Sequence, residues 1–378
     1  MLYLCEKINI MGKGDRKTRK GKRFVGSSRK RTKLNCYGIN KKEQKKIIDY
    51  QQEAAYAIKH NIVPYGDIFD FEGTPNEKQY KVLYLFCREN LNIHYRRKSI
   101  SHTSFLFSND FSINAKARKK NNQNVILINI GLIQNCIDKY LYNYALNDFI
   151  TSKEPYLVDR FDSSLSYLAF QINTQFTYYH ELAHLFQFST ISKEQELQEI
   201  GGDDKFDIIK HKLEINADTY SSICISTHIY QYINKTFGND INQDFASKTI
   251  TIFGVCLLEY IINFTSEYDL YFDKYSHPHP LIRLLNIILN ITNHFSQIPI
   301  WREKGIILNV NSLFRDIIDF HKELEDNKVF KSGFSNFISQ YIVNMEKIVS
   351  YTSKIIHWDN GEFTDAVSIW NKHVETLD

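Results

Sequence analysis

One stretch of the chain, from Tyr167 to Ile200, contains neither proline nor glycine and is rich in apolar residues. It predicts a long buried helix, because nothing in it interrupts the backbone hydrogen bonds. Inside it stands His180-Glu181-Leu182-Ala183-His184. Residues four apart share a helix face, so both imidazoles can reach one metal ion, and Glu181 can reach a water bound to that ion. The competing interpretation is a chance match on a core helix.

A second polar pair follows, in which Glu214 and Asp218 are again four apart. Acidic pairs on helices are usually solvated, but the flanking residues here are apolar, and a buried pair needs a cation. A catalytic zinc needs three protein ligands and an open position for water, so we predict Zn2+ bound by His180, His184 and Glu214. Asp218 would accept the N–H of a ligand imidazole and fix its tautomer. His211 is a weaker ligand candidate, and other divalent ions could occupy such a site.

The net charge of +4 conceals two parts of opposite sign. Residues 11–33 hold eleven Lys and Arg and one Asp, a charge of +10 that leaves the rest of the chain at −6. This segment has too few apolar residues to bury a core, so we predict a disordered arm over residues 1–40 that binds a polyanion. The alternative is a solubilising tail without a specific partner. The candidate nucleic-acid contacts are Lys13, Arg16, Lys17, Arg19, Lys20, Lys22 and Arg23.

The rest of the composition is typical of a folded cytoplasmic protein. Of the 378 residues, 43% are hydrophobic, which is enough for a large core. The six cysteines are scattered without a C-x-x-C pair, which favours reduced thiols. The longest apolar run, Ile252 to Phe264, is too short for a membrane span and contains Glu259, so we expect a buried helix and no membrane partner. A phosphate-binding glycine loop is absent from the sequence, which argues against an ATP-driven enzyme.

Helical spacing dominates the rest of the chain, notably over Lys41–His60, Asn76–Asn90 and Leu132–Leu146. Segments Ser104–Arg118 and Val125–Ile130 flank a polar turn and predict a β-hairpin, whose second strand would end at Gly131. We therefore expect an α+β fold, mainly helical with a small sheet. It would comprise a basic arm (1–40), a domain that carries the metal site (41–300) and a helical C-terminal extension packed on that domain (301–378).

The two metal-binding motifs together resemble those of the gluzincin zinc peptidases. Ser276-His277-Pro278, with Arg283 six residues after the histidine, is similar to a segment of CAAX prenyl proteases and HtpX-like peptidases. Asn114-Ala115 and Val125-Ile126-Leu127 resemble the strand pair before the zinc helix in that clan. The similarity extends from about Phe111 to Leu284. Those relatives are embedded in membranes, whereas this chain shows no spanning segment, so a soluble relative is implied, similar to phage-exclusion peptidases of the Lit type.

This resemblance implies roles for individual residues. Glu181 would act as general base toward a zinc-activated water and then as general acid toward the leaving amine. His277 or Arg283 would stabilise the oxyanion, with His279 as a further candidate. Alternatively, Arg283 only pins a proline-bounded loop onto the helices of the metal site. A peptide substrate could add as a strand to the hairpin edge at Val125–Asn129.

The basic arm has a resemblance of its own. Residues 11–27 read MGKGDRKTRKGKRFVGS and are similar to the bacterial small-subunit ribosomal protein THX, a short peptide held among ribosomal RNA helices. The similarity extends to about Lys33, departs at Ser28-Arg29-Lys30-Arg31, and suggests Met11 as an alternative start. It implies docking on ribosomal RNA.

Together these features predict a soluble zinc endopeptidase, cytoplasmic and ribosome-associated, that acts on a translation-associated protein. One alternative is a plain cytoplasmic peptidase with an incidental arm. The other is a non-catalytic ribosome-associated protein with a structural metal site, which would have no need of a base such as Glu181 beside its first ligand.

Overall fold

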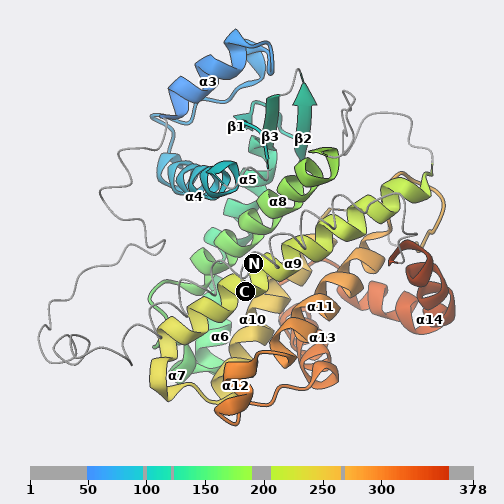
Figure 1. Ribbon diagram of the computed structural model, residues 1–378. Helices are drawn as coiled ribbons and strands as arrows, with labels where there is room; N and C mark the ends of the chain where they lie inside the picture. The colour runs from blue at the N-terminus through green and yellow to red at the C-terminus, as the bar shows by residue number, and fades with distance from the viewer. Residues whose placement is uncertain (1–48, 97–99, 121–122, 190–205, 265–268, 357–378) are drawn as a thin grey trace, which may run out of the picture.

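The computed structural model describes residues 49–96, 100–120, 123–189, 206–264 and 269–356. This part of the chain is mainly helical with one small sheet, which confirms the predicted fold class (Figure 1). The basic arm, with its seven candidate nucleic-acid residues, lies outside the described residues. So do the first residues of the helix expected over Lys41–His60 and the end of the C-terminal extension.

A three-stranded sheet lies beside the first two described helices, α3 (Tyr50–Lys59) and α4 (Glu77–Arg96). The order of its strands is β1 (Thr103–Ser108), β3 (Gln123–Asn129) and β2 (Ala115–Lys120). Strand β1 runs parallel to β3, and β2 runs antiparallel to it. Phe105, Phe107 and the apolar residues of β3 are fully buried, so the sheet is part of the core.

The predicted hairpin exists between β2 and β3 only. The sequence predicts one strand over Ser104–Arg118, whereas the chain forms two strands on opposite sides of β3. The break lies where the Asp110 carboxylate accepts the amide hydrogen of Ser112 (2.8 Å) and turns the chain. Gly131 lies in the first turn of a helix rather than ending the strand, and a Cβ there would collide with the backbone of Phe111.

The strand order makes the predicted peptide-binding edge at Val125–Asn129 wrong, since both sides of β3 are paired. The outer side of β1 is also occupied: Glu53 Oε1 accepts the Phe105 amide hydrogen (3.1 Å), and the Tyr50 hydroxyl accepts that of Phe107 (3.1 Å). Strand β2 forms the remaining edge of the sheet. Within the described ranges, no strand pairs with its outer side.

Short helical segments connect the sheet to the main helical body. The single helix expected over Leu132–Leu146 is divided, because the Asn143 side chain accepts the Leu146 amide hydrogen (3.0 Å) and starts a new helix. The segments are α5 (Ile130–Cys136), the π-helical turn η3 (Ile137–Leu141), α6 (Tyr144–Lys153) and α7 (Pro155–Val158). Two 3-10 turns, η2 (Tyr65–Asp67) and η4 (Gly238–Asp240), lie elsewhere in the chain.

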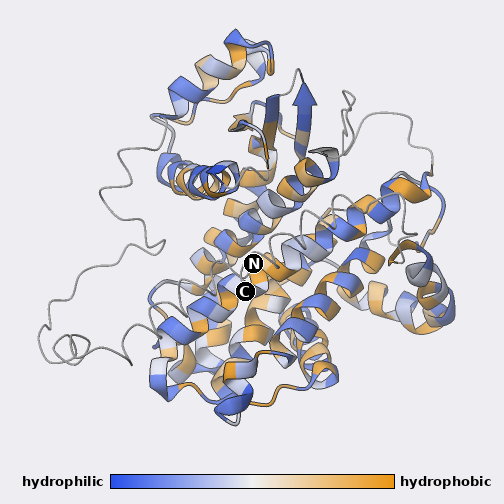
Figure 2. Cartoon of the chain, viewed as in Figure 1, coloured by the Kyte–Doolittle hydropathy of each residue, from blue (hydrophilic) through white to orange (hydrophobic). Residues whose placement is uncertain are grey.

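Two long helices, α8 (Leu165–Ser189) and α9 (Ile208–Phe237), pack side by side at the centre of the molecule (Figure 1). Helices α10 (Gln243–Ile262) and α11 (Pro280–Ser296) pack on this pair, and apolar residues gather where these helices meet (Figure 2). By length and hydropathy, α10 would suit a membrane span, but 83% of that apolar stretch is buried inside the protein. It is the buried helix that the sequence predicts around Ile252–Phe264.

The last described helices are α12 (Pro299–Glu303), α13 (Val310–Asp326) and α14 (Phe334–Ile356). Helix α13 packs on α10 and α11, and α14 packs on α9 and α11. Tyr351 and Ile355 of α14 form an apolar cluster with Ile215 of α9 and Ile282 of α11. Since Ile215 follows Glu214, α14 supports the helix that carries a predicted metal ligand.

Candidate metal centre

The packing of α8 on α9 brings the three predicted ligands together. His180 Nε2 lies 3.1 Å from His184 Nε2, and Glu214 lies 3.2 Å from the first of these atoms and 3.3 Å from the second. All three residues are buried. Ligands 2.0–2.1 Å from a tetrahedral zinc are about 3.3 Å apart. The side chains present therefore fit one zinc-sized ion.

The other ring nitrogen of each histidine faces an acceptor. His180 Nδ1 lies 3.1 Å from Asp218 Oδ1, and His184 Nδ1 lies 2.7 Å from Gln187 Oε1. A carboxylate only accepts hydrogen bonds, so in a neutral His180 ring this contact favours the hydrogen on Nδ1, which leaves Nε2 with a lone pair. Asp218 thus lies where the sequence predicts it, behind a ligand imidazole.

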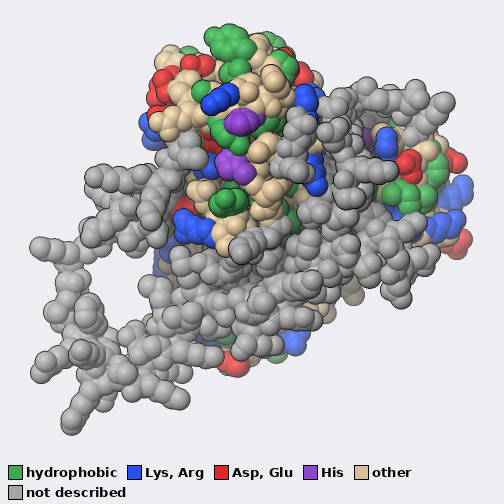
Figure 3. Space-filling model, turned by 45° about the horizontal axis from the view of Figure 1, so that its top comes forward, with side chains coloured by type: hydrophobic (Ala, Val, Ile, Leu, Met, Phe, Trp, Pro, Cys, Tyr) green, Lys and Arg blue, Asp and Glu red, His purple; other side chains and the backbone are tan. Residues whose placement is uncertain are grey.

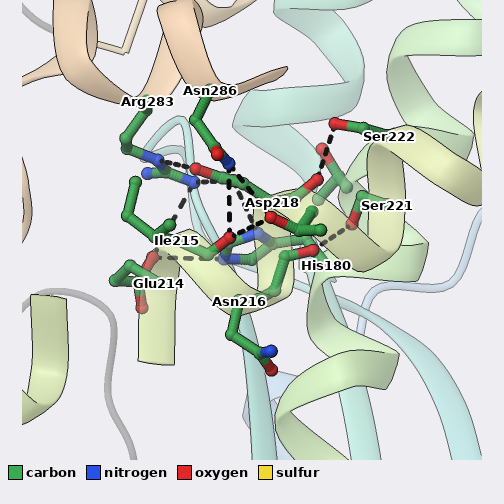
Figure 4. Close-up of polar contacts among 12 residues, drawn as sticks. His180, Glu214, Ile215, Asn216, Asp218, Ser221, Ser222, Arg283 and Asn286 are labelled. Atoms are coloured by element: carbon green, nitrogen blue, oxygen red, sulfur yellow. Dashed lines mark hydrogen bonds and ion pairs between the residues drawn. The ribbon is translucent and has the colours of Figure 1, made fainter. Parts of the chain in front are cut away.

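Arg283 reaches Asp218 from α11 and forms a bidentate pair with it (Figure 4). Its Nε lies 2.9 Å from Oδ2 and one terminal nitrogen lies 2.8 Å from Oδ1. The same terminal nitrogen is 3.7 Å from Glu214 Oε2. Two of the Arg283 donors are thus bound to Asp218. This contact agrees with the alternative in which Arg283 holds its segment against the helices of the metal site.

Both carboxylates of the centre are held in the ionised form. Burial alone would raise the pKa of Glu214, but the neighbouring imidazoles of His277, His184 and His180 together lower it well below its usual value. Burial would likewise raise the pKa of Asp218, but the charge and hydrogen bonds of Arg283, together with His180, lower it. An ionised carboxylate is the form that binds a cation.

The two remaining predicted catalytic residues lie at or beside the ligands. Glu181 follows His180 on α8 and is buried. His277 Nε2 lies 3.9 Å from Glu214 Oε1, and the His277 side chain is 24% exposed, so it lies at a more open side of the centre. Its Nδ1 is 3.0 Å from the Ser276 hydroxyl.

Two other histidines near the centre have structural contacts. His279 caps α11, where its Nδ1 accepts the Leu281 amide hydrogen (3.1 Å). His211 lies about one turn before Glu214, but its ring nitrogens bind the Tyr275 carbonyl and the Tyr351 hydroxyl. His211 therefore links α9 to α14 instead of joining the three ligands.

Gln187 is a residue of this centre that the sequence argument missed. Its contact with His184 depends on a side-chain amide three residues along α8, and amides at this spacing are common on helices. The decisive partners, the Leu213 carbonyl and Asn216, come from α9. Nothing in the local sequence of α8 reveals that these groups are near.

Charge is mixed on the part of the described surface that Figure 3 shows. Around α3 and α4, side chains of both signs are interspersed with apolar ones (Figure 3). The strongly basic segment is residues 11–33, outside the described residues, so its predicted contacts with nucleic acid stay predictions.

Comparison with known proteins adds no relative: no family model, curated protein or solved structure matches the chain. The gluzincin and THX resemblances stay predictions. Function must therefore be inferred from the geometry of the metal centre.

Proposed function

We propose that this protein is a zinc-dependent endopeptidase in which His180, His184 and Glu214 hold the ion. The supporting observation is that two imidazole nitrogens and one carboxylate face each other at 3.1–3.3 Å in a buried site. Lone pairs and a negative charge at this distance repel unless a proton or a metal ion lies between them. Two imidazoles and one glutamate form a donor set found in catalytic zinc sites, which keep a fourth position open.

Each remaining residue has a role that follows from its place. Bound zinc would supply a water with a pKa near neutrality. Glu181, next to the first ligand, would accept a proton from the attacking water and deliver it to the leaving amine. His277, at the more open side, donates to the developing oxyanion. Arg283 holds Asp218, and Asp218 orients His180.

The substrate strand would add to β2 rather than to β3. Strand β2 packs on α8, which carries both histidine ligands, and it is the edge whose outer side is not paired within the described ranges. An extended peptide that pairs with β2 gains backbone hydrogen bonds independent of its sequence. This arrangement fits an endopeptidase that acts on extended or locally unfolded segments.

The first test is the substitution Glu181→Gln. We expect zinc bound at one ion per chain in the wild type and in the variant, with peptidase activity lost in the variant only. Metal content by mass spectrometry, together with new protein termini in cells that express either form, measures both properties. The same substitution at Glu346, exposed on α14, is the control and should change neither.

The outcomes separate the competing functions. Unchanged cleavage by Glu181→Gln would remove Glu181 from the mechanism. Bound zinc without any cleavage by the wild type would favour the non-catalytic metal site, and absence of bound zinc would overturn the metal centre itself.

We further propose that residues 11–33 dock the enzyme on ribosomal RNA, which would make a translation-associated protein its substrate. The support is the concentration of +10 charge in this segment. Full-length protein should co-sediment with ribosomes in a salt-dependent manner, and a chain that starts at Leu34 should not. Equal binding of the two chains would rule out docking through the arm.

A further inference from the structure

We infer that Gln187 is a positioning residue that sets the tautomer of His184 and holds the backbone beside Glu214, an inference that rests on the proposed metal site. Gln187 lies on α8 about one turn after His184 and is 2% exposed. Its amide contacts groups on both helices that supply ligands.

The orientation of the amide follows from its partners. Nε2 lies 3.0 Å from the Leu213 carbonyl oxygen and 3.0 Å from Asn216 Oδ1. A backbone carbonyl only accepts hydrogen bonds, so the amide nitrogen must face α9 and the amide oxygen must face His184.

This orientation decides the state of the ligand. Gln187 Oε1 lies 2.7 Å from His184 Nδ1, and because an amide oxygen only accepts, Nδ1 must carry the hydrogen. In the neutral ring, Nε2 then keeps its lone pair on the side that faces His180 and Glu214. The carbonyl of Leu213 thus selects, through Gln187, the tautomer of His184 that can bind a metal.

The same side chain acts on the ligand of the other helix. Leu213 immediately precedes Glu214, so the bond from Gln187 holds the α9 backbone at the point where the third ligand begins. The two histidines also differ in their partners, since His180 faces the carboxylate of Asp218 and His184 faces a neutral amide. Loss of Gln187 therefore affects two ligands, whereas loss of Asp218 affects His180 and the Arg283 pair.

The test compares two variants with different chemistry. Gln187→Leu removes the acceptor for His184 and the donor to Leu213. We expect zinc affinity to fall about 10- to 100-fold, measured by competition with a chromophoric chelator. In the metal-free protein, we expect long-range 1H–15N NMR spectra to show the His184 ring changing from the Nδ1–H form to a mixture with Nε2–H. Gln187→Glu keeps an acceptor for His184 Nδ1 but loses the donor to the Leu213 carbonyl. It should therefore retain the Nδ1–H form and still bind zinc more weakly than the wild type.

Gln171→Leu, the same substitution on an earlier turn of α8, is the control and should match the wild type in both measurements. Wild-type affinity and an unchanged tautomer in Gln187→Leu would overturn the inference. If Gln187→Leu does not fold, a Gln187→Glu variant that binds zinc as tightly as the wild type would overturn it instead. Failure of the wild type to bind zinc would refute the proposed function. The tautomer of the His184 ring in the metal-free protein tests the role of Gln187 independently of zinc binding.

Discussion

At the scale of single residues, each histidine of the candidate metal centre has an acceptor side chain behind its Nδ1. Asp218 contacts His180 and accepts two hydrogen bonds from the guanidinium group of Arg283. Because carboxylate and guanidinium are both largely buried, neither can be replaced by water without cost. The orientation of His180 therefore depends on a residue of α11 as well as on α9.

Asp218→Asn tests this dependence. The amide retains the shape of the side chain but removes the charge that Arg283 and His180 face. We expect zinc affinity to fall about 10- to 100-fold and the free energy of unfolding, measured with urea in the presence of a chelator, to fall by about 3 kcal/mol. Asp326→Asn at the exposed end of α13 is the control. A variant with wild-type affinity would show that Asp218 does not orient the ligand.

The spacing of residues in the sequence predicts some members of this site but not others. His180, His184, Glu214 and Asp218 were accessible because a four-residue interval places side chains on one helix face. The roles of Gln187 and Arg283 depend on which backbone and which carboxylate lie opposite them, and those contacts come from other helices. Local periodicity contains no information about such partners.

At the scale of elements, α10 and α13 pack unusually closely at one point. Gly254 of α10 faces Ile317 of α13, and a Cβ at Gly254 would lie 2.7 Å from Ile317 Cδ1 and 3.1 Å from its Cγ1. The side chain of Ile317 is fully buried and has little room to move. The glycine therefore allows the contact at the cost of helix propensity.

Gly254→Ala should destabilise the protein despite the better helix propensity of alanine. Overpacking typically costs about 1–3 kcal/mol, against a propensity gain of about 1 kcal/mol. We expect a net loss of about 1 kcal/mol in the free energy of unfolding, measured by urea titration. The double variant with Ile317→Val should recover part of this loss, because it lacks the Cδ1 atom that the introduced methyl group would meet. Strictly additive losses in the double variant would contradict the proposed contact.

The elements themselves were partly predictable. Long helices and the β2–β3 hairpin follow from residue patterns, but the place of β1 does not. It is paired on the other side of β3, with its outer amides bound by Glu53 and Tyr50 of α3. Which strand a segment pairs with depends on tertiary contacts. Alternation of apolar and polar residues along the segment shows only that it is extended.

At the scale of the whole molecule, burial of neutral histidines links folding to pH. His228 of α9 lies against the Tyr179 hydroxyl (2.8 Å), and burial lowers its pKa to about 4. The unfolded chain has a pKa near 6.5 for this group, so between pH 6.5 and 4 it binds more protons than the folded chain. Stability therefore falls as pH decreases through this window, by up to about 3 kcal/mol for a shift of this size.

His228→Gln should make the stability less dependent on pH while keeping a partner for Tyr179. We expect the difference in unfolding free energy between about pH 7 and about pH 4 to shrink by about 1–3 kcal/mol relative to the wild type. Urea titrations in the presence of a chelator exclude any contribution from bound metal. Gln52→Asn, exposed on α3, is the control and should leave the difference unchanged. Equal pH profiles for His228→Gln and the wild type would contradict this assignment.

The positive charge of strand β2 affects which chains could pair with the edge of the sheet. Its six residues include Lys116, Arg118, Lys119 and Lys120. Two copies of the protein joined antiparallel through this edge would place cations opposite cations, which opposes self-assembly. A foreign polypeptide with neutral or acidic side chains meets no such repulsion. If a further strand adds to this edge, electrostatics would therefore favour a segment of another protein over a second copy of this one.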